Sequence, residues 1–336
     1  MNLTLVEWNI QDFFIHLAYP VSEHDIASLS NEHWSLLAKA DQPLKPLSKI
    51  REIAAVIREL DADILFLCEV GGLESLEAFN SIFLGDTYQP FLLDGNSNRG
   101  IESGFLVKRA LGLTCKVKSH KDWPVPFEYP HEKDPISFRL AAEAATYYDL
   151  GKPGERRLSR DIPALYLSKG NVTQAVFLLV HLKSGYDLAG VDVDGKVRRA
   201  AELKALLGIR ESIQTNVGAS VPIFLTGDFN GRACRSTMAP EFSLLYQTTD
   251  YEDALEITKV PLYERITQMT FIRREVLSSQ LDYFFVPLAF QENVKEAYVY
   301  RYHEDEEEKM LPLSFRDRWL LPSDHYPLVV RMEIDL

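Results

Sequence analysis

Short apolar runs recur along the chain, with polar turns between them. They predict buried strands at 3–9, 63–68, 103–107, 112–118, 162–167, 175–181, 221–226, 281–286 and 326–333. Between 46 and 60 the apolar residues return every three or four positions, which predicts an amphipathic helix, and a second helix is predicted over 195–212. This alternation of strands with helices is compatible with an α/β protein.

Two long segments, 11–45 and 119–158, show neither pattern. Both are rich in aromatic residues, proline and histidine, and both exceed the length of an ordinary loop. We therefore expect insertions that have some structure of their own or that act as mobile functional loops. The chain contains no repeat, no low-complexity linker and no clear domain boundary.

The composition is typical of a soluble globular protein, with 336 residues of which 46% are apolar and 25% are charged. The net charge of −13 argues against broad, salt-driven binding of nucleic acid, although it does not exclude a small basic groove. The three cysteines lie far apart, so neither a disulfide framework nor a zinc cluster is indicated. No transmembrane run and no signal peptide are found, so the expected location is the cytoplasm.

The stretch VPIFLTGDFNGRA, residues 221–233, ends an apolar run in an acid and an amide. Asp228 and Asn230 are two positions apart, so on a strand both side chains would point to the same face. The glycines on either side allow a ligand or another backbone segment to approach closely. A polar turn that closes the strand is the alternative interpretation, since Gly, Asp and Asn are the commonest turn residues.

Other polar residues also lie at the ends of predicted strands. They are Asn9, Glu69, His181, Asp282, Asp324 and His325. Each one alone has an ordinary explanation as a solvated loop residue, a satisfied polar group, an edge position or a turn cap. Their repetition at strand ends predicts that they meet at one edge of a sheet pair, where they form a single polar site.

Eight short motifs give the chain a resemblance to a known superfamily. In chain order they are WNI, DADILFLCEV, NRGIESGFLVKR, SRDIPALYL, HLKSG, GDFN, SSQLDYFFV and SDHYP. Together they resemble the endonuclease/exonuclease/phosphatase superfamily, which includes the DNase I-like nucleases. The resemblance implies a four-layered α/β sandwich, with two mixed β-sheets packed face to face and helices outside. It also implies a single domain over 1–336, with insertions at about 11–45 and 119–158.

The resemblance implies metal-dependent chemistry for these residues. A phosphate ester repels a nucleophile, so catalysis needs a cation, an oriented water and donors for the developing charge. By their place in the family pattern, Glu69, Asn9 and Asp324 would hold Mg²⁺ or Mn²⁺, which prefer hard oxygen ligands. Asp228 would act as the base or orienting group for the water, and Asn230 would help to hold the phosphate or the water.

The same pattern assigns roles to two histidines and an arginine. His325 would donate to the phosphoryl oxygen, and Asp282 would accept from its other ring nitrogen. Glu102 falls where DNase-like members hold an acid against the histidine that His181 matches. This pair is expected to keep His181 protonated to higher pH. Arg160 matches an arginine that grips phosphate in some members.

Six arginines are candidates for a local basic rim near this site. They are Arg99, Arg139, Arg156, Arg157, Arg160 and Arg232. Three of them, Arg139, Arg156 and Arg157, are expected to be solvated surface residues without a role in binding.

These features predict a phosphodiester hydrolase that acts by in-line attack of an activated water. The preferred interpretation is a DNase I-like endonuclease, with DNA rather than RNA as its substrate, no protein partner and a monomeric state. The alternative is a sphingomyelinase-like or phosphoinositide-phosphatase-like phosphoesterase. Inositol 5-phosphatases carry Cys-Asp-Arg where this chain has Leu281-Asp282-Tyr283, which argues against that branch. An inactive binding protein is disfavoured because the matched acid and histidine positions are all present.

Overall fold

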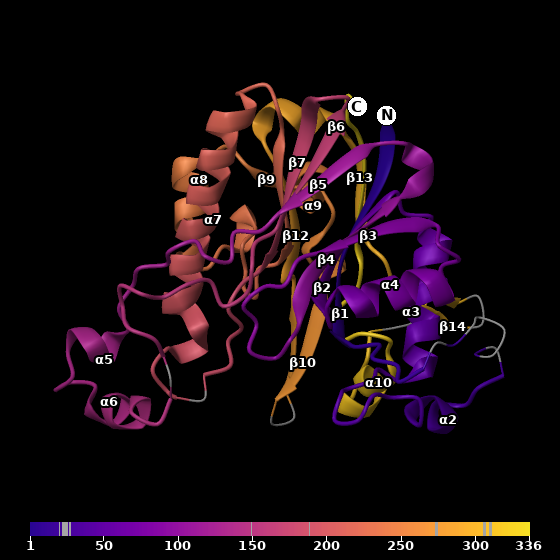
Figure 1. The fold of residues 1–336 in the computed structure, drawn as a ribbon. Helices are drawn as coiled ribbons and strands as arrows, with labels where there is room; N and C mark the ends of the chain where they lie inside the picture. The colour runs from indigo at the N-terminus through magenta and orange to yellow at the C-terminus, as the bar shows by residue number, and fades with distance from the viewer. Residues whose placement is uncertain are drawn as a thin grey trace.

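The computed structural model describes residues 1–19, 21, 26, 28–148, 150–187, 189–272, 275–304, 307–308 and 311–336. Two six-stranded mixed sheets lie face to face (Figure 1). In spatial order, the first sheet consists of β13 (Val294–Val299), β16 (Leu328–Glu333), β1 (Asn2–Phe13), β2 (Ile64–Val70), β4 (Glu102–Lys108) and β3 (Tyr88–Leu92). The second sheet consists of β5 (Thr114–Lys118), β6 (Ala164–Lys169), β7 (Val172–His181), β8 (Ile223–Asp228), β12 (Asp282–Val286) and β9 (Glu252–Asp253).

Helices cover the outer faces of both sheets, which completes the expected four-layered sandwich (Figure 1). On the first sheet these are α3 (Leu47–Leu60) and α4 (Leu73–Phe83), and on the second they are α7 (Lys196–Val217) and α8 (Ser243–Thr248). The remaining helices are α2 (Asn31–Ser35), α5 (Pro130–Lys133), α6 (Arg139–Ala145), α9 (Ala254–Ile257) and α10 (Phe315–Leu320). Within the described ranges, no helix combines the length and the apolar character that crossing a bilayer requires.

A group of phenylalanine rings packs in the core between the sheets. The Phe177 ring in β7 lies 5.1 Å from that of Phe66 in β2 and 5.0 Å from that of Phe224 in β8, measured between centroids. Phe284 in β12 belongs to the same cluster. Strands buried on both faces read as continuous apolar runs rather than as alternating patterns, which is why these runs were visible in the sequence. The packed core makes a rigid support for the residues at the strand ends.

The residues that were expected to form a polar site lie at the end of the sandwich opposite the chain termini. Figure 1 shows both termini together at one end, while α5, α6, α10 and β10 (Gln268–Ile272) project at the other. β1 runs parallel to β2, and β7 runs parallel to β8. Their carboxyl ends therefore meet at the far edge, and the antiparallel strands β12 and β16 begin there.

The predicted strands and the two predicted helices are all present, with shifted ends. β1 continues to Phe13, and α7 continues to Val217. Several elements were not predicted. They are α4, α8, α9, α10, β3, β9, β13 and the hairpin of β10 with β11 (Glu275–Ser279). A small hairpin of β14 (His303–Glu304) and β15 (Glu307–Glu308) was also not predicted. β3 contains Pro90 and β13 contains the adjacent charges of Lys295 and Glu296, so neither resembles a buried strand.

Both expected insertions have some structure of their own. Segment 11–45 contains α2, and two isolated bridges, Ile15 with Leu44 and Leu17 with Ala38, fold it back on itself. Segment 119–158 contains α5 and α6. Both segments therefore carry local structure rather than acting as extended loops.

Candidate active site

Three of the expected residues lie in one row across the second sheet. The register of β7, β8 and β12 pairs His181 with Asp228 and Asp228 with Asp282. Side chains directly opposite each other on neighbouring strands point to the same face. All three residues are almost completely buried. The register of the sheet thus brings together an imidazole and two carboxylates from distant parts of the chain.

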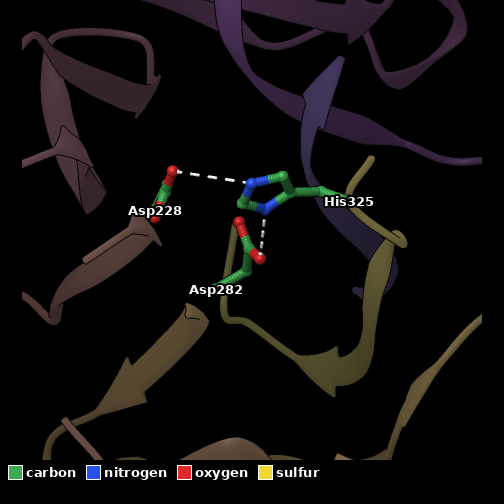
Figure 2. A group of neighbouring side chains, drawn as sticks. All are labelled: Asp228, Asp282 and His325. Carbon is green, nitrogen blue, oxygen red and sulfur yellow. Dashed lines mark hydrogen bonds and ion pairs between the residues drawn. The ribbon is translucent and has the colours of Figure 1, made fainter. Parts of the chain in front are cut away.

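His325 reaches this row from the loop before β16. Its Nδ1 makes a hydrogen bond of 2.7 Å with Oδ2 of Asp282, and its Nε2 lies 4.0 Å from Oδ2 of Asp228 (Figure 2). The imidazole therefore bridges two carboxylates, one at each ring nitrogen. This is the arrangement expected for a histidine that is oriented by one acid and faces the reaction with its other nitrogen.

Hydrogen bonds join the first and last motifs of the chain beside the site. Trp8 Nε1 donates to the backbone oxygen of His325 at 3.0 Å, and Ser323 Oγ donates to the backbone oxygen of Asn9 at 2.6 Å. The backbone N–H of His325 donates in turn to Ser323 Oγ at 3.2 Å. The motifs WNI and SDHYP are therefore fixed against each other by buried contacts.

Asp228 is the centre of the polar cluster. Its Oδ2 accepts from Nδ2 of Asn9 at 3.1 Å and lies 3.5 Å from Nε2 of His181. Its Oδ1 accepts from the backbone N–H of Asn230 at 2.8 Å. The side chain of Asn230 donates to the backbone oxygen of Leu182 at 3.0 Å. These contacts hold the carboxylate of Asp228 in one orientation.

Burial and neighbouring charges shift the protonation of this cluster. Burial, with repulsion from Asp282, raises the pKa of Asp228 to about 7. Burial alone would lower the pKa of His325, but Asp282, Asp228 and Asp324 outweigh it and raise this pKa to about 10. Near neutral pH, His325 is therefore protonated while Asp228 is close to the midpoint of its titration. A proton acceptor and a proton donor thus lie side by side.

Four residues at the rim of the site adopt left-handed backbone conformations. Gln11, Asp12, Glu69 and Asn230 have φ angles of 45°, 44°, 66° and 52°. Non-glycine residues seldom adopt this region, and such residues cluster at functional sites where the surrounding structure holds them.

Glycine is required at position 227 of the GDFN motif. Its φ is 132°, and an added Cβ would come within 2.0 Å of the backbone oxygen of Val180. The glycine therefore lets β7 and β8 approach closely where His181 and Asp228 meet.

A cavity of about 600 Å³ lies over the cluster. Eight of the ten residues that the sequence assigned to the site line it, namely Asn9, Glu69, Arg160, His181, Asp228, Asn230, Asp324 and His325. Asp282 does not line it because it lies fully buried behind the imidazole of His325. The volume is within the usual range of ligand pockets.

Solved structures share this arrangement of layers, although no family model and no curated protein matches the sequence. D. rerio TDP2 complexed with single-strand DNA product has a TM-score of 0.55 at 13% identity, with 99% of each chain covered. The human Nocturnin catalytic domain with bound sulfate has a TM-score of 0.56 at 16% identity, covering 99% of this chain and 94% of that one. An endonuclease/exonuclease/phosphatase family protein from Bacteroides thetaiotaomicron has a TM-score of 0.54 at 16% identity, covering 100% of this chain and 99% of that one.

The chain has the endonuclease/exonuclease/phosphatase fold. At these identities the likeness establishes the fold alone.

Within this fold, Glu102 does not form the contact that the family pattern suggested. No hydrogen bond or ion pair joins the described residues Glu102 and His181. Instead, Oε1 of Glu102 accepts from the backbone N–H of Ser97 at 3.3 Å, and Oε2 is buried without a hydrogen-bond partner. Burial raises the pKa of Glu102 to about 7. The predicted contact of this pair is therefore not formed.

His181 faces other carboxylates. Its Nε2 lies 3.5 Å from Asp228 and 3.9 Å from Oε1 of Glu69, while its Nδ1 has no hydrogen-bond partner. Burial, reinforced by the nearby charges of Arg160 and His325, lowers the pKa of His181 well below its usual value. The expectation that His181 stays protonated to higher pH is therefore wrong, because burial and the neighbouring positive charges disfavour the protonated ring.

Three oxygen donors suit a divalent ion at the position that the family pattern implies. The carboxylates of Glu69 and Asp324 and the amide of Asn9 line the same cavity. Two carboxylates and an amide fit Mg²⁺ or Mn²⁺, which prefer hard oxygen ligands. Oε2 of Glu69 already accepts from the backbone N–H of Asp12 at 2.9 Å, which holds it in place. Asp324 forms an ion pair with Arg318, so a bound ion would compete with this guanidinium.

A second group of side chains could also hold a metal ion. Ligand atoms of Asp228, Asp282 and His325 all lie within 4.8 Å of one another. An ion bound to all three would have to displace the hydrogen bond of 2.7 Å between Asp282 and His325. We therefore favour Glu69, Asn9 and Asp324 as the metal ligands.

The six candidate arginines lie in different environments. Arg232 is exposed and lines a separate cavity. Arg99 and Arg160 line the cavity over the polar cluster, and Arg160 is oriented by donation to the backbone oxygen of Leu182 at 3.2 Å. Arg139 and Arg157 are exposed, as expected. Arg156 was expected on the surface, but it is buried and pairs with Glu132, where it stabilises the 119–158 insertion.

Sequence reasoning did not select several residues that contribute to the site. Gln11 and Asp12 line the cavity immediately after the WNI motif, and Arg318 holds Asp324. Glu7 is fully buried, and neither of its side-chain oxygens has a hydrogen-bond partner. Burial, with repulsion from Asp282 and Asp228, raises its pKa well above the usual value. Its place in the sequence could have indicated this role, because Glu7 is an acid in an otherwise apolar strand, two positions before Asn9.

Proposed function

We propose that the protein is a Mg²⁺- or Mn²⁺-dependent phosphodiester hydrolase, a DNase I-like endonuclease that cleaves DNA in preference to RNA. One observation carries the proposal. The Asp228 carboxylate lies in a cavity between two imidazoles, 3.5 Å from His181 and 4.0 Å from His325. In the proposal the enzyme is a cytoplasmic monomer with a single domain.

In this mechanism Asp228 accepts the proton of the attacking water. A pKa of about 7 suits a general base at neutral pH, because the group is partly ionised and still basic. His325, which is protonated near neutrality, donates to the phosphoryl oxygen that gains charge during in-line attack. Asp282 orients the His325 ring through the bond of 2.7 Å and stabilises its positive charge.

Other residues of the cavity hold the phosphate and the ion. Arg160 and Asn230 are both fixed by the backbone oxygen of Leu182, and both can donate to phosphate oxygens. Glu69, Asn9 and Asp324 would hold the divalent ion, which supplies positive charge beside the phosphate when bound. His181, which is neutral, would help to orient the water or the leaving group.

The structural neighbours support a phosphoester-cleaving activity without defining the substrate. The D. rerio TDP2 structure holds a single-strand DNA product, and the Nocturnin structure holds a sulfate, an anion of the shape of phosphate. Both features agree with a cavity that contains Arg160 and His325.

The proposal is tested by hydrolysis of bis-p-nitrophenyl phosphate and nicking of supercoiled plasmid DNA, each with Mg²⁺, Mn²⁺ or EDTA. We expect activity with either ion and none in EDTA. Asp228→Asn should reduce turnover at least about a hundredfold, because it removes the general base. The matched control is Asp335→Asn, an exposed acid near the chain terminus, which should retain full turnover. Full activity in EDTA, or normal turnover of Asp228→Asn, would refute the proposal.

A further inference from the structure

A second cavity opens beside the catalytic one, where α10 lies against the beginning of α3. Its volume is about 630 Å³, and it shares Gln11, Asp12, Arg99 and Asp324 with the catalytic cavity. Because these four residues line both spaces, the two cavities are adjacent. A substrate whose phosphate lies at Asp228 can therefore extend along this groove, which we call the α10 groove.

The α10 groove is basic on an acidic protein. Its lining contains four cationic side chains, Lys45, Lys49, Arg99 and Arg318, and two carboxylates, Asp12 and Asp324. The chain as a whole carries a net charge of −13. Arg99 pairs with Asp12 and Arg318 pairs with Asp324, so the excess of positive charge comes from Lys45 and Lys49. This excess fits a polyanion that continues beyond the scissile phosphate.

Two exposed aromatic rings project at this groove from one face of α10. Phe315 and Trp319 are four residues apart, so they lie on the same face of the helix. Their exposed fractions are 61% and 64%, although both line the groove. Nζ of Lys49 lies 5.4 Å from the centroid of the Trp319 ring. Large aromatic rings left accessible beside cations are typical of surfaces on which unpaired bases stack.

The lining favours a nucleic-acid strand over a lipid. A lipid chain would use only the apolar part of the lining and not the cations among it. That apolar part consists of Phe14, Pro43, Leu44, Pro46, Phe315 and Trp319. A nucleotide uses both features, since its phosphates pair with the cations and its base stacks on the ring. Bases within a duplex are already stacked on their neighbours, so they have no free face for Trp319.

We propose that the α10 groove binds an unpaired nucleotide next to the scissile phosphate, with its base stacked on Trp319, and that single-stranded nucleic acid is the substrate. This inference rests on the proposed phosphodiesterase function and narrows its substrate. Trp319 is thus a specificity-determining residue contributed by the segment just before the SDHYP motif.

The experiment compares three probes of equal length at one fixed salt concentration in EDTA. They are a labelled oligothymidylate, an oligomer of the same charge that lacks every base, and a duplex. Stacking on one aromatic ring should make the wild type bind the oligothymidylate about 5- to 160-fold more tightly than the baseless oligomer. The duplex should also bind more weakly than the oligothymidylate.

Variants assign this preference to the groove. Trp319→Ala should remove most of the difference between the oligothymidylate and the baseless oligomer, and Phe315→Ala should reduce it. The matched control is Tyr147→Ala, an exposed aromatic residue outside both cavities, which should keep the full difference. Thermal melting of each variant checks that the fold is unchanged.

Several outcomes would overturn the inference. These are equal affinity of the wild type for the first two probes, a preference for the duplex, or full base preference in Trp319→Ala. A shift of tryptophan emission with phosphatidylcholine vesicles and none with oligothymidylate would assign the groove to lipid instead. If the protein hydrolyses bis-p-nitrophenyl phosphate but binds the oligothymidylate and the baseless oligomer equally, this inference is refuted and the proposed function stands. Base preference without hydrolysis of any diester would refute the proposed function and leave the groove as a binding site.

Discussion

The hydrogen bond between Asp282 and His325 offers the most direct test of the proposed chemistry. Asp282 is fully buried, and its Oδ2 lies 2.7 Å from Nδ1 of His325. Asp282→Asn keeps the size and shape of the side chain but removes its charge. The change therefore perturbs the protonation of His325 more than it perturbs packing.

The size of the effect follows from this contact. A hydrogen bond to a charged group contributes about 1.5–3 kcal/mol, and one pKa unit corresponds to about 1.4 kcal/mol. The pKa of His325, held at about 10 chiefly by Asp282 against the effect of burial, should therefore fall by about one to two units. The protonated ring is the proposed donor. The alkaline loss of activity should therefore occur at a lower pH in Asp282→Asn than in the wild type.

The assay is kcat/KM for bis-p-nitrophenyl phosphate as a function of pH, at saturating Mg²⁺. For the wild type we expect a rise through pH about 7, as Asp228 ionises, and a fall near pH 10, as His325 loses its proton. In Asp282→Asn the alkaline limb should move to lower pH, while Asp335→Asn should leave both limbs in place. An alkaline limb that does not move in Asp282→Asn would refute the assignment of His325 as the proton donor.

Three further predictions concern residues around this bond. His325→Ala should lower turnover at least about a hundredfold with an unchanged melting temperature, and near-normal turnover would contradict its role. No hydrogen bond joins Glu102 to His181, so the losses of turnover in Glu102→Gln and His181→Ala should multiply in the double variant. A double variant no worse than His181→Ala would show instead that the two residues act as one unit. Burial is the main cause of the raised pKa of the Glu7 carboxyl group. The protonated side chain therefore contributes to the stability of the fold at pH values below the ordinary pKa of Glu. This contribution is lost as the pH rises through the higher pKa of the folded state. Glu7→Gln should therefore flatten the decline of melting temperature with rising pH, and an equally steep decline would contradict this explanation.

The location of the site could be predicted from the sequence because it depends on local patterns. The central strands are buried on both faces, so each is a run of apolar residues, and the polar residue that ends a run is conspicuous. Asp228 after Leu225 and His181 after Val180 were found in this way, and both line the cavity. Edge strands with proline or adjacent charges, such as β3 and β13, carry no such pattern, and they were missed.

The sequence by itself determined which residue types stand at the strand ends, and therefore the oxygen and imidazole donors of the site. Only the tertiary structure decided which of them meet. Register across β7, β8 and β12 aligned His181, Asp228 and Asp282, whereas packing kept Glu102 from bonding to His181. Protonation was also decided by the folded state, because burial lowers the pKa of His181 while the carboxylates around His325 raise its pKa. Hydration and charge around a side chain depend on neighbours that are distant in sequence, so no local pattern could have revealed them.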